Sequence, residues 1–124
     1  MQFEQYSVQA DRTAIYPNRG NNLMYPILGL VGEVGETCEN VKKVIRDRNG
    51  DFDEETLKLI QKELGDVLWY LNALSFEFIC IADRKRDIKN GIDFFSLSAI
   101  ACENLRKLSK RREDGKLHGS GDTR

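Results

Sequence analysis

The sequence is poor in the residues that build many catalytic and metal sites. It contains one histidine, His118, and three cysteines, Cys38, Cys80 and Cys102, none of them in a Cys-x-x-Cys pair. A histidine-rich metal site, a Ser-His-Asp triad and a disulfide framework are therefore poorly supported. The cysteines lie in apolar stretches, which predicts small buried hydrophobic residues. Any bound metal would need oxygen ligands, and these favour hard cations such as Mg²⁺ or Mn²⁺.

The chain also lacks long apolar runs and a charge bias. No run approaches the roughly 20 residues of a membrane span, and the N-terminus shows no basic and apolar pattern of a secretory signal. Lysine and arginine number 19 against 20 aspartates and glutamates. We therefore expect a cytoplasmic protein that binds neither a membrane nor a nucleic acid polymer.

Proline is scarce, which leaves most of the 124 residues free to form helices. Only Pro17 and Pro26 occur, both in the first quarter of the chain. Asn49-Gly50 is a helix stop and Asp53 is a good N-cap. The pattern predicts a single domain over 1–112, followed by a flexible glycine-rich tail over 113–124. Its four helices are expected at about 2–15, 26–48, 53–82 and 96–112.

Apolar residues recur at spacings of three and four in the last three of these helices. The helix expected at 26–48 has the stripe Ile27, Val31, Val34, Cys38, Val41 and Ile45. The two long helices are joined by a few residues and should pack antiparallel. The fold class is therefore all-α, an antiparallel bundle of about four helices. The apolar surface exceeds what one small bundle can bury, which predicts a homo-oligomer.

Two acidic pairs lie off these stripes. Glu33 and Glu36 share one side of the first long helix, and Glu63 and Asp66 share one side of the second. Four carboxylates that converge from two helices repel one another unless a cation lies among them, and their oxygens suit Mg²⁺. The alternative is that they form ordinary surface ion pairs with nearby lysines.

Two segments carry a resemblance to a known family. Residues 27–36 (ILGLVGEVGE) and 62–71 (KELGDVLWYL) resemble the MazG-like nucleotide pyrophosphohydrolases, whose signature is Glu-x-x-Glu, a spacer and Glu-x-x-Asp. The resemblance implies an all-α dimer or tetramer that hydrolyses nucleoside triphosphates to the monophosphate and pyrophosphate. It also implies that the acidic residues Glu33, Glu36, Glu63 and Asp66 hold Mg²⁺, with Mn²⁺ as a substitute.

Phosphoryl chemistry needs a positioned water, charge neutralisation and a pocket for the base. Glu36 is our choice of general base for a water that attacks the α-phosphorus. Glu39 is either a helper or a surface residue. The residues expected to bind the substrate phosphates and base are Lys43, Lys107, Lys110, Arg111, Trp69 and Tyr70. The alternative role of the basic residues is to solvate the protein surface. The alternative role of Trp69 and Tyr70 is to pack in the hydrophobic core.

Two rival functions remain open from the sequence. One is a related all-α pyrophosphohydrolase with another substrate, such as dUTP or phosphoribosyl-ATP. The other is a helical oligomer without catalytic activity that acts as an interaction or regulatory module. The tail, with His118, Asp122 and Arg124, either closes over a site or stays disordered without a ligand.

Overall fold

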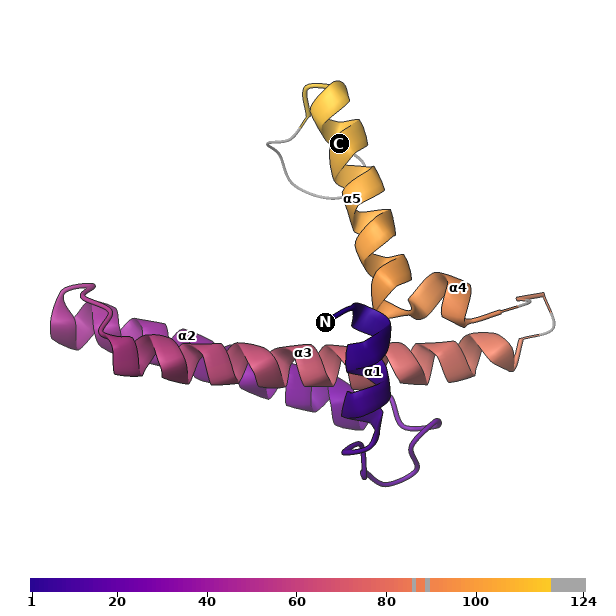
Figure 1. Cartoon of the computed structure of the whole chain (residues 1–124), viewed down its shortest axis with the longest axis horizontal. Helices are drawn as coiled ribbons and strands as arrows, with labels where there is room; N and C mark the ends of the chain where they lie inside the picture. Colours follow the sequence, from indigo (N-terminus) through magenta and orange to yellow (C-terminus); the bar gives the residue numbers. More distant parts are fainter. Residues whose placement is uncertain (86, 89, 117–124) are drawn as a thin grey trace.

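The computed structural model describes residues 1–116 except 86 and 89, and these residues form five helices and no strand (Figure 1). The tail prediction lies largely outside the described residues. Helical structure is as the sequence predicts. The helices are α1 (Phe3–Asp11), α2 (Met24–Arg48), α3 (Glu54–Asp83), α4 (Ile92–Phe95) and α5 (Leu97–Glu113).

The ends of the long helices follow local chemistry that the sequence predicts. Asn49 has a φ of 52° and Gly50 a φ of 82°, so the chain leaves α2 through left-handed backbone. Asp53 caps α3 by accepting a hydrogen bond from the Thr56 amide at 2.8 Å. Pro26 lies in the first turn of α2, where its missing N–H costs nothing.

One predicted boundary was wrong, and one short helix was missed. The first helix ends at Asp11 rather than near residue 15, because the hydroxyl of Thr13 donates to the carbonyl of Ala10 and the chain turns. The short helix α4 was not predicted. Ser96 has extended backbone, which separates α4 from α5, and its hydroxyl caps α5 by accepting from the amide of Ala99.

Helix α3 is the axis of the molecule. It runs back along α2 to form a long hairpin, α1 crosses the second half of α3, and α5 rises steeply from the same region (Figure 1). The helix pairs with the most extensive contacts are α2 with α3, then α3 with α4 and α4 with α5. The antiparallel bundle and its assembly into an oligomer stay predictions.

The hydrophobic core is small and lies where α1 and the loop after it meet α3. Ala14, Tyr16 and Ala73 form a buried cluster, and Trp69 packs against it. We expected all three cysteines to be buried. This was wrong for Cys38 and Cys102, which are exposed, whereas Cys80 is partly buried. In the apolar stripe that contains Cys38, Val31, Val34 and Ile45 are also exposed.

Helix α3 is also unusual in composition. By length and composition alone, it is the one helix among the described residues that is long and apolar enough to cross a membrane. Within the single chain, 22% of its most apolar stretch is buried. The apolar residues of α3 therefore have more surface available than this copy covers.

Candidate metal centre

The hairpin brings three of the four predicted acidic residues together. Carboxylate oxygens of Glu33, Glu36 and Glu63 lie within 4.8 Å of one another. Glu33 and Glu36 are one turn apart on α2, and Glu63 faces them from α3. Asp66 lies one turn further along α3 and acts electrostatically on Glu33. We call Glu33, Glu36, Glu63 and Asp66 the acidic cluster.

The cluster is electrostatically unfavourable as it stands. Partial burial raises the pKa of Glu33, and the charges of Asp66, Glu36 and Glu63 raise it further. Lysines near the hairpin pair with other residues: Lys42 with Glu39, and Lys58 with Glu54. Glu39 and Glu54 therefore form ordinary surface ion pairs with lysines. Glu33 instead faces other carboxylates. Such a set of oxygen donors fits a divalent hard cation.

Aromatic side chains lie at one end of the acidic cluster. Gly29 leaves room for the Tyr70 ring, because a Cβ at this position would come within 2.0 Å of that ring. Tyr25 lies beside Tyr70, with ring centroids 6.3 Å apart, and stacks on Tyr16 at 4.9 Å. Burial raises the pKa of the Tyr70 phenol, and the neighbouring Tyr25, Glu33 and Asp66 raise it further. The phenol therefore stays protonated at neutral pH and can donate a hydrogen bond.

A pocket lined by both polar and apolar side chains lies at the other end of the cluster, toward the tip of the hairpin. Its volume is about 340 Å³. Lys43 lies there, 3.9 Å from Glu39, and Arg48 donates hydrogen bonds to Asp53 and Thr56. This pocket, which we call the tip pocket, is lined by Asn40, Lys43, Val44, Asp47, Arg48, Thr56 and Leu59. The hairpin therefore presents acids in the middle, with aromatic residues on one side and cationic residues on the other.

The structure separates the other predicted substrate residues from the acidic cluster. Trp69 donates a hydrogen bond to the Thr13 hydroxyl at 2.8 Å and packs on the core, which is its alternative role. Lys107, Lys110 and Arg111 lie on α5, which rises away from the hairpin (Figure 1). In a single chain, Lys43 and Tyr70 are thus the predicted substrate residues nearest the acids.

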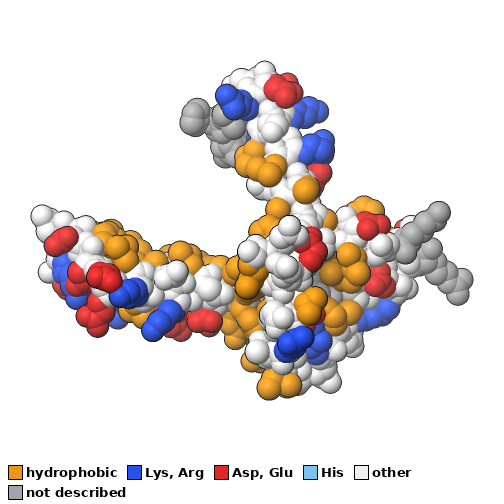
Figure 2. Space-filling model, viewed as in Figure 1, with side chains coloured by type: hydrophobic (Ala, Val, Ile, Leu, Met, Phe, Trp, Pro, Cys, Tyr) orange, Lys and Arg blue, Asp and Glu red, His pale blue; other side chains and the backbone are white. Residues whose placement is uncertain are grey.

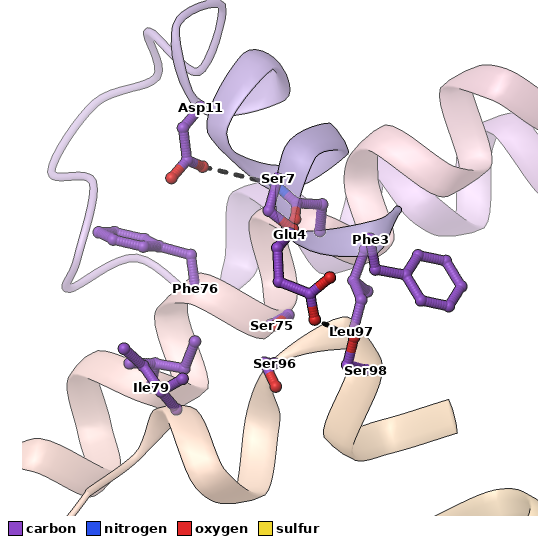
Figure 3. Close-up of a pocket in the computed structure, with 12 residues that line it drawn as sticks. Phe3, Glu4, Ser7, Asp11, Ser75, Phe76, Ile79, Ser96, Leu97 and Ser98 are labelled. Carbon is purple, nitrogen blue, oxygen red and sulfur yellow. Dashed lines mark hydrogen bonds between the residues drawn. The ribbon is translucent and has the colours of Figure 1, made fainter. Parts of the chain in front are cut away.

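A second pocket lies between α1, α3 and the start of α5 (Figure 3). Its volume is about 190 Å³, and the buried side chains of Asn72 and Ser75 lie on its wall. Both are already hydrogen-bonded: Asn72 to Asp11 at 3.4 Å, and Ser75 to the carbonyl of Phe95. None of the acidic cluster lines this pocket, so it is not part of the candidate metal centre.

Three residues of structural or functional interest were not found from the sequence. Tyr25 lies one turn before Gly29 and beside Tyr70. Burial raises the pKa of the Tyr6 phenol, and the charge of nearby Asp66 raises it further. Glu77 is completely buried in α3. A carboxylate inside the apolar run FEFI was the available signal for Glu77, whereas Tyr6 and Tyr25 gave none.

Comparison with known proteins supports the family resemblance that the acidic motif indicated. Residues 24–115 match the model of the MazG nucleotide pyrophosphohydrolase domain. The Gene 37 protein of Mycobacterium phage L5 is 38% identical over 129 residues, and the alignment covers all of both chains. No solved structure matches. The matched region contains α2, α3 and the whole acidic cluster, and on this evidence the chain belongs to the MazG nucleotide pyrophosphohydrolase family.

Proposed function

We propose that the chain is a Mg²⁺-dependent nucleoside triphosphate pyrophosphohydrolase that releases pyrophosphate and a nucleoside monophosphate. The observation that carries the proposal is the convergence of Glu33, Glu36 and Glu63 oxygens within 4.8 Å. Membership of the MazG family supports this class of reaction, and the acidic cluster is the site that we propose for it. When bound, Mg²⁺ would neutralise triphosphate charge and stabilise the pyrophosphate that leaves.

The order of side chains along the hairpin suggests how the substrate would lie. The acidic cluster, whose residues would hold the cation, would lie beside the α-phosphate. The tip pocket, with Lys43 and Arg48, would receive the two outer phosphates. Tyr70 and Tyr25 would contact the nucleoside on the opposite side of the acids. In this arrangement cationic residues would lie near the leaving group, and aromatic rings near the base.

Glu36 would act as the general base in this arrangement. It is the exposed member of the converging trio, so water can approach its carboxylate. A glutamate at this position would accept the proton of a water that attacks the α-phosphorus. The Tyr70 hydroxyl, held protonated, would donate a hydrogen bond to a phosphate oxygen or to Glu33.

The test is pyrophosphate release from a panel of ribo- and deoxynucleoside triphosphates, with and without Mg²⁺. We expect Glu36→Gln to reduce turnover by about 100-fold or more. Glu39→Gln is the matched control, because Glu39 is the next glutamate on α2 and is paired with Lys42. It should retain activity near that of the unmodified chain. Orthophosphate as the product would contradict attack at the α-phosphorus.

The two rival functions give different results in the same experiments. A relative specialised for dUTP or phosphoribosyl-ATP would release pyrophosphate from that substrate alone. A non-catalytic interaction module would hydrolyse nothing, and Mg²⁺ would not raise its melting temperature. The proposed enzyme should melt at a higher temperature with Mg²⁺, and this increase should disappear in Glu36→Gln.

A further inference from the structure

The carboxylate of Glu77 contacts the segments that carry both rings of a stacked tyrosine pair. Glu77 is completely buried in α3, and its Oε1 accepts hydrogen bonds from the Tyr16 hydroxyl and the Gly20 amide, each at 2.7 Å. Its Oε2 accepts from the Asn22 amide at 2.8 Å. The Asn22 side chain in turn accepts from the Tyr25 amide at 3.1 Å, in the first turn of α2. One oxygen therefore fixes Tyr16, and the other fixes, through Asn22, the start of the helix that carries Tyr25.

The stacked pair has a buried ring and an accessible ring. The Tyr16 and Tyr25 rings are nearly parallel, with an interplanar angle of 7° and centroids 4.9 Å apart. Tyr16 is 6% exposed, whereas Tyr25 is 41% exposed, so the outer ring is available to a ligand. The Tyr70 ring lies beside it at 6.3 Å. We call Tyr16, Tyr25 and Tyr70 the aromatic platform. A ring that is already held by its neighbours loses little freedom when a ligand stacks on it.

The aromatic platform lies between Glu77 and the acidic cluster. Asp66, Tyr70 and Glu77 follow one another along α3 at spacings close to whole turns, so they share one side of the helix. The 11 residues from Asp66 to Glu77 span about 16 Å. Glu77 is therefore too far from the acidic cluster to touch a cation or a reacting phosphate there. Any effect of Glu77 on the site has to pass through the platform.

The loop over residues 12–23 has further contacts with α3, so a small change at Glu77 would not release it. Trp69 donates a hydrogen bond to the Thr13 hydroxyl, and the Arg19 guanidinium lies 3.8 Å from the centroid of the Phe76 ring. Figure 2 shows the molecule to be broadest where α1 and this loop pack against α3, and narrower along the hairpin toward its tip. Loss of one hydrogen bond to Glu77 should therefore shift the platform rings while the chain stays folded.

We propose that Glu77 is a positioning residue for the nucleobase of the substrate, because it sets the place of the Tyr25 ring on which the base stacks. The inference rests on the proposed function, which supplies a substrate that carries a base. Every nucleobase has a π-face, so a tyrosine ring can receive purines and pyrimidines alike. Glu77 would thus contribute to the affinity for the base and not to hydrolysis at the α-phosphorus.

The test compares a ligand that carries a base with one that does not, in two variants. Tyr16→Phe keeps the ring and removes the hydroxyl that donates to Glu77. Glu77→Gln places an amide NH₂ against at least one of the two backbone N–H groups that the carboxylate accepts from. Either variant should raise KM for a nucleoside triphosphate about tenfold and leave kcat within about twofold. The inhibition constant of inorganic tripolyphosphate, which has no base, should stay within about twofold.

Ser96→Ala is the matched control for a loss of stability alone. Ser96 caps α5 and contacts no residue of the aromatic platform, so this variant should melt at a lower temperature and keep the KM of the unmodified chain. Melting curves identify the temperature at which all variants are folded, and the assays are run there. An equal rise in KM and in the tripolyphosphate inhibition constant, a fall in kcat alone, or an unchanged KM in both platform variants would overturn the positioning role.

A binding experiment without metal separates this proposal from the proposed function. If the chain hydrolyses no triphosphate, calorimetry with a nucleoside monophosphate in EDTA decides the matter. Binding that is about tenfold weaker in Tyr16→Phe and Glu77→Gln than in the unmodified chain would mean that the positioning role stands although the proposed function fails. Equal binding by all three proteins, or no binding by the unmodified chain, would overturn both.

Discussion

Glu77 and Glu33 are two carboxylates of the same helical hairpin that meet opposite surroundings. Glu77 accepts hydrogen bonds from the Tyr16 hydroxyl and the Gly20 amide at 2.7 Å, and from the Asn22 amide at 2.8 Å. Burial alone would raise the pKa of Glu77, but these hydrogen bonds and Arg19 lower it. Burial and three neighbouring acids raise the pKa of Glu33.

The difference separates a structural carboxylate from a candidate ligand. The chain itself supplies donors to the charge of Glu77, which holds the loop over residues 12–23 against α3. At Glu33 the chain supplies more negative charge, so a cation from solution would be a favourable partner. A buried acid is thus not by itself a sign of a metal site, whereas a set of acids without cationic partners is the stronger indication.

The largest expected effect is the removal of the Glu77 carboxylate. Glu77→Ala leaves the Tyr16 hydroxyl and two amides without an acceptor and should lower the free energy of unfolding by about 3–5 kcal/mol. Chemical denaturation measures this loss, with Glu39→Ala, at a half-buried glutamate on the surface of α2, as the control. Because the folded pKa of Glu77 is lowered, its contribution is present above the usual value of 4.5 and is lost as pH falls through the folded value. Glu77→Gln should flatten this acid limb, and an unchanged pH profile would contradict the assignment.

A smaller effect is expected from two glycines near Glu33. Gly29→Val should displace the Tyr70 ring and cost about 1–3 kcal/mol. Gly32→Ala meets nothing within 4 Å and should instead raise stability by up to about 1 kcal/mol through helix propensity. Thermal melting of both variants measures the contrast. Equal effects would mean that Tyr70 does not depend on the gap at Gly29.

The smallest effect is expected from neutralising Glu33 in the metal-free protein. Its raised pKa means that the ionised form costs stability at neutral pH, and that the metal-free protein gains stability as pH falls through this value. Glu33→Gln removes this cost, so it should raise the free energy of unfolding by less than about 1 kcal/mol, since solvent screens the charges. Added Mg²⁺ should then stabilise the variant less than the unmodified chain. If Glu33→Gln instead lowered the free energy of unfolding of the metal-free protein, the contrast drawn between Glu33 and Glu77 would be wrong.

The sequence predicts the local features of the fold well. The stop at Asn49-Gly50, the Asp53 cap and the place of Pro26 depend on neighbouring residues alone, and each was confirmed. The proximity of Glu33, Glu36 and Glu63 was also predicted, because each acidic pair shares one side of its helix and the short link makes the two helices antiparallel neighbours. The chemical roles of these residues stay predictions.

Other features depend on contacts that periodicity does not encode. The partners of Glu77 are 55–61 residues away in the chain, so its burial with full pairing could not be read from its neighbours. The stripe that contains Val34 and Cys38 shows which residues share a face, but not whether the same chain covers it. This is why the burial predicted for Cys38 was wrong.

The unbroken course of α3 limits how the length of this chain can change. One helix of 30 residues carries Glu63 and Asp66 toward α2 and holds Glu77 under the loop over residues 12–23. Inserting one residue between Asp66 and Glu77 would rotate one group by about 100° relative to the other, and both could not keep their neighbours. The tip of the hairpin around Gly50 and Asp51 has no such constraint. Length variation among relatives should therefore concentrate at the tip and be absent from the middle of α3.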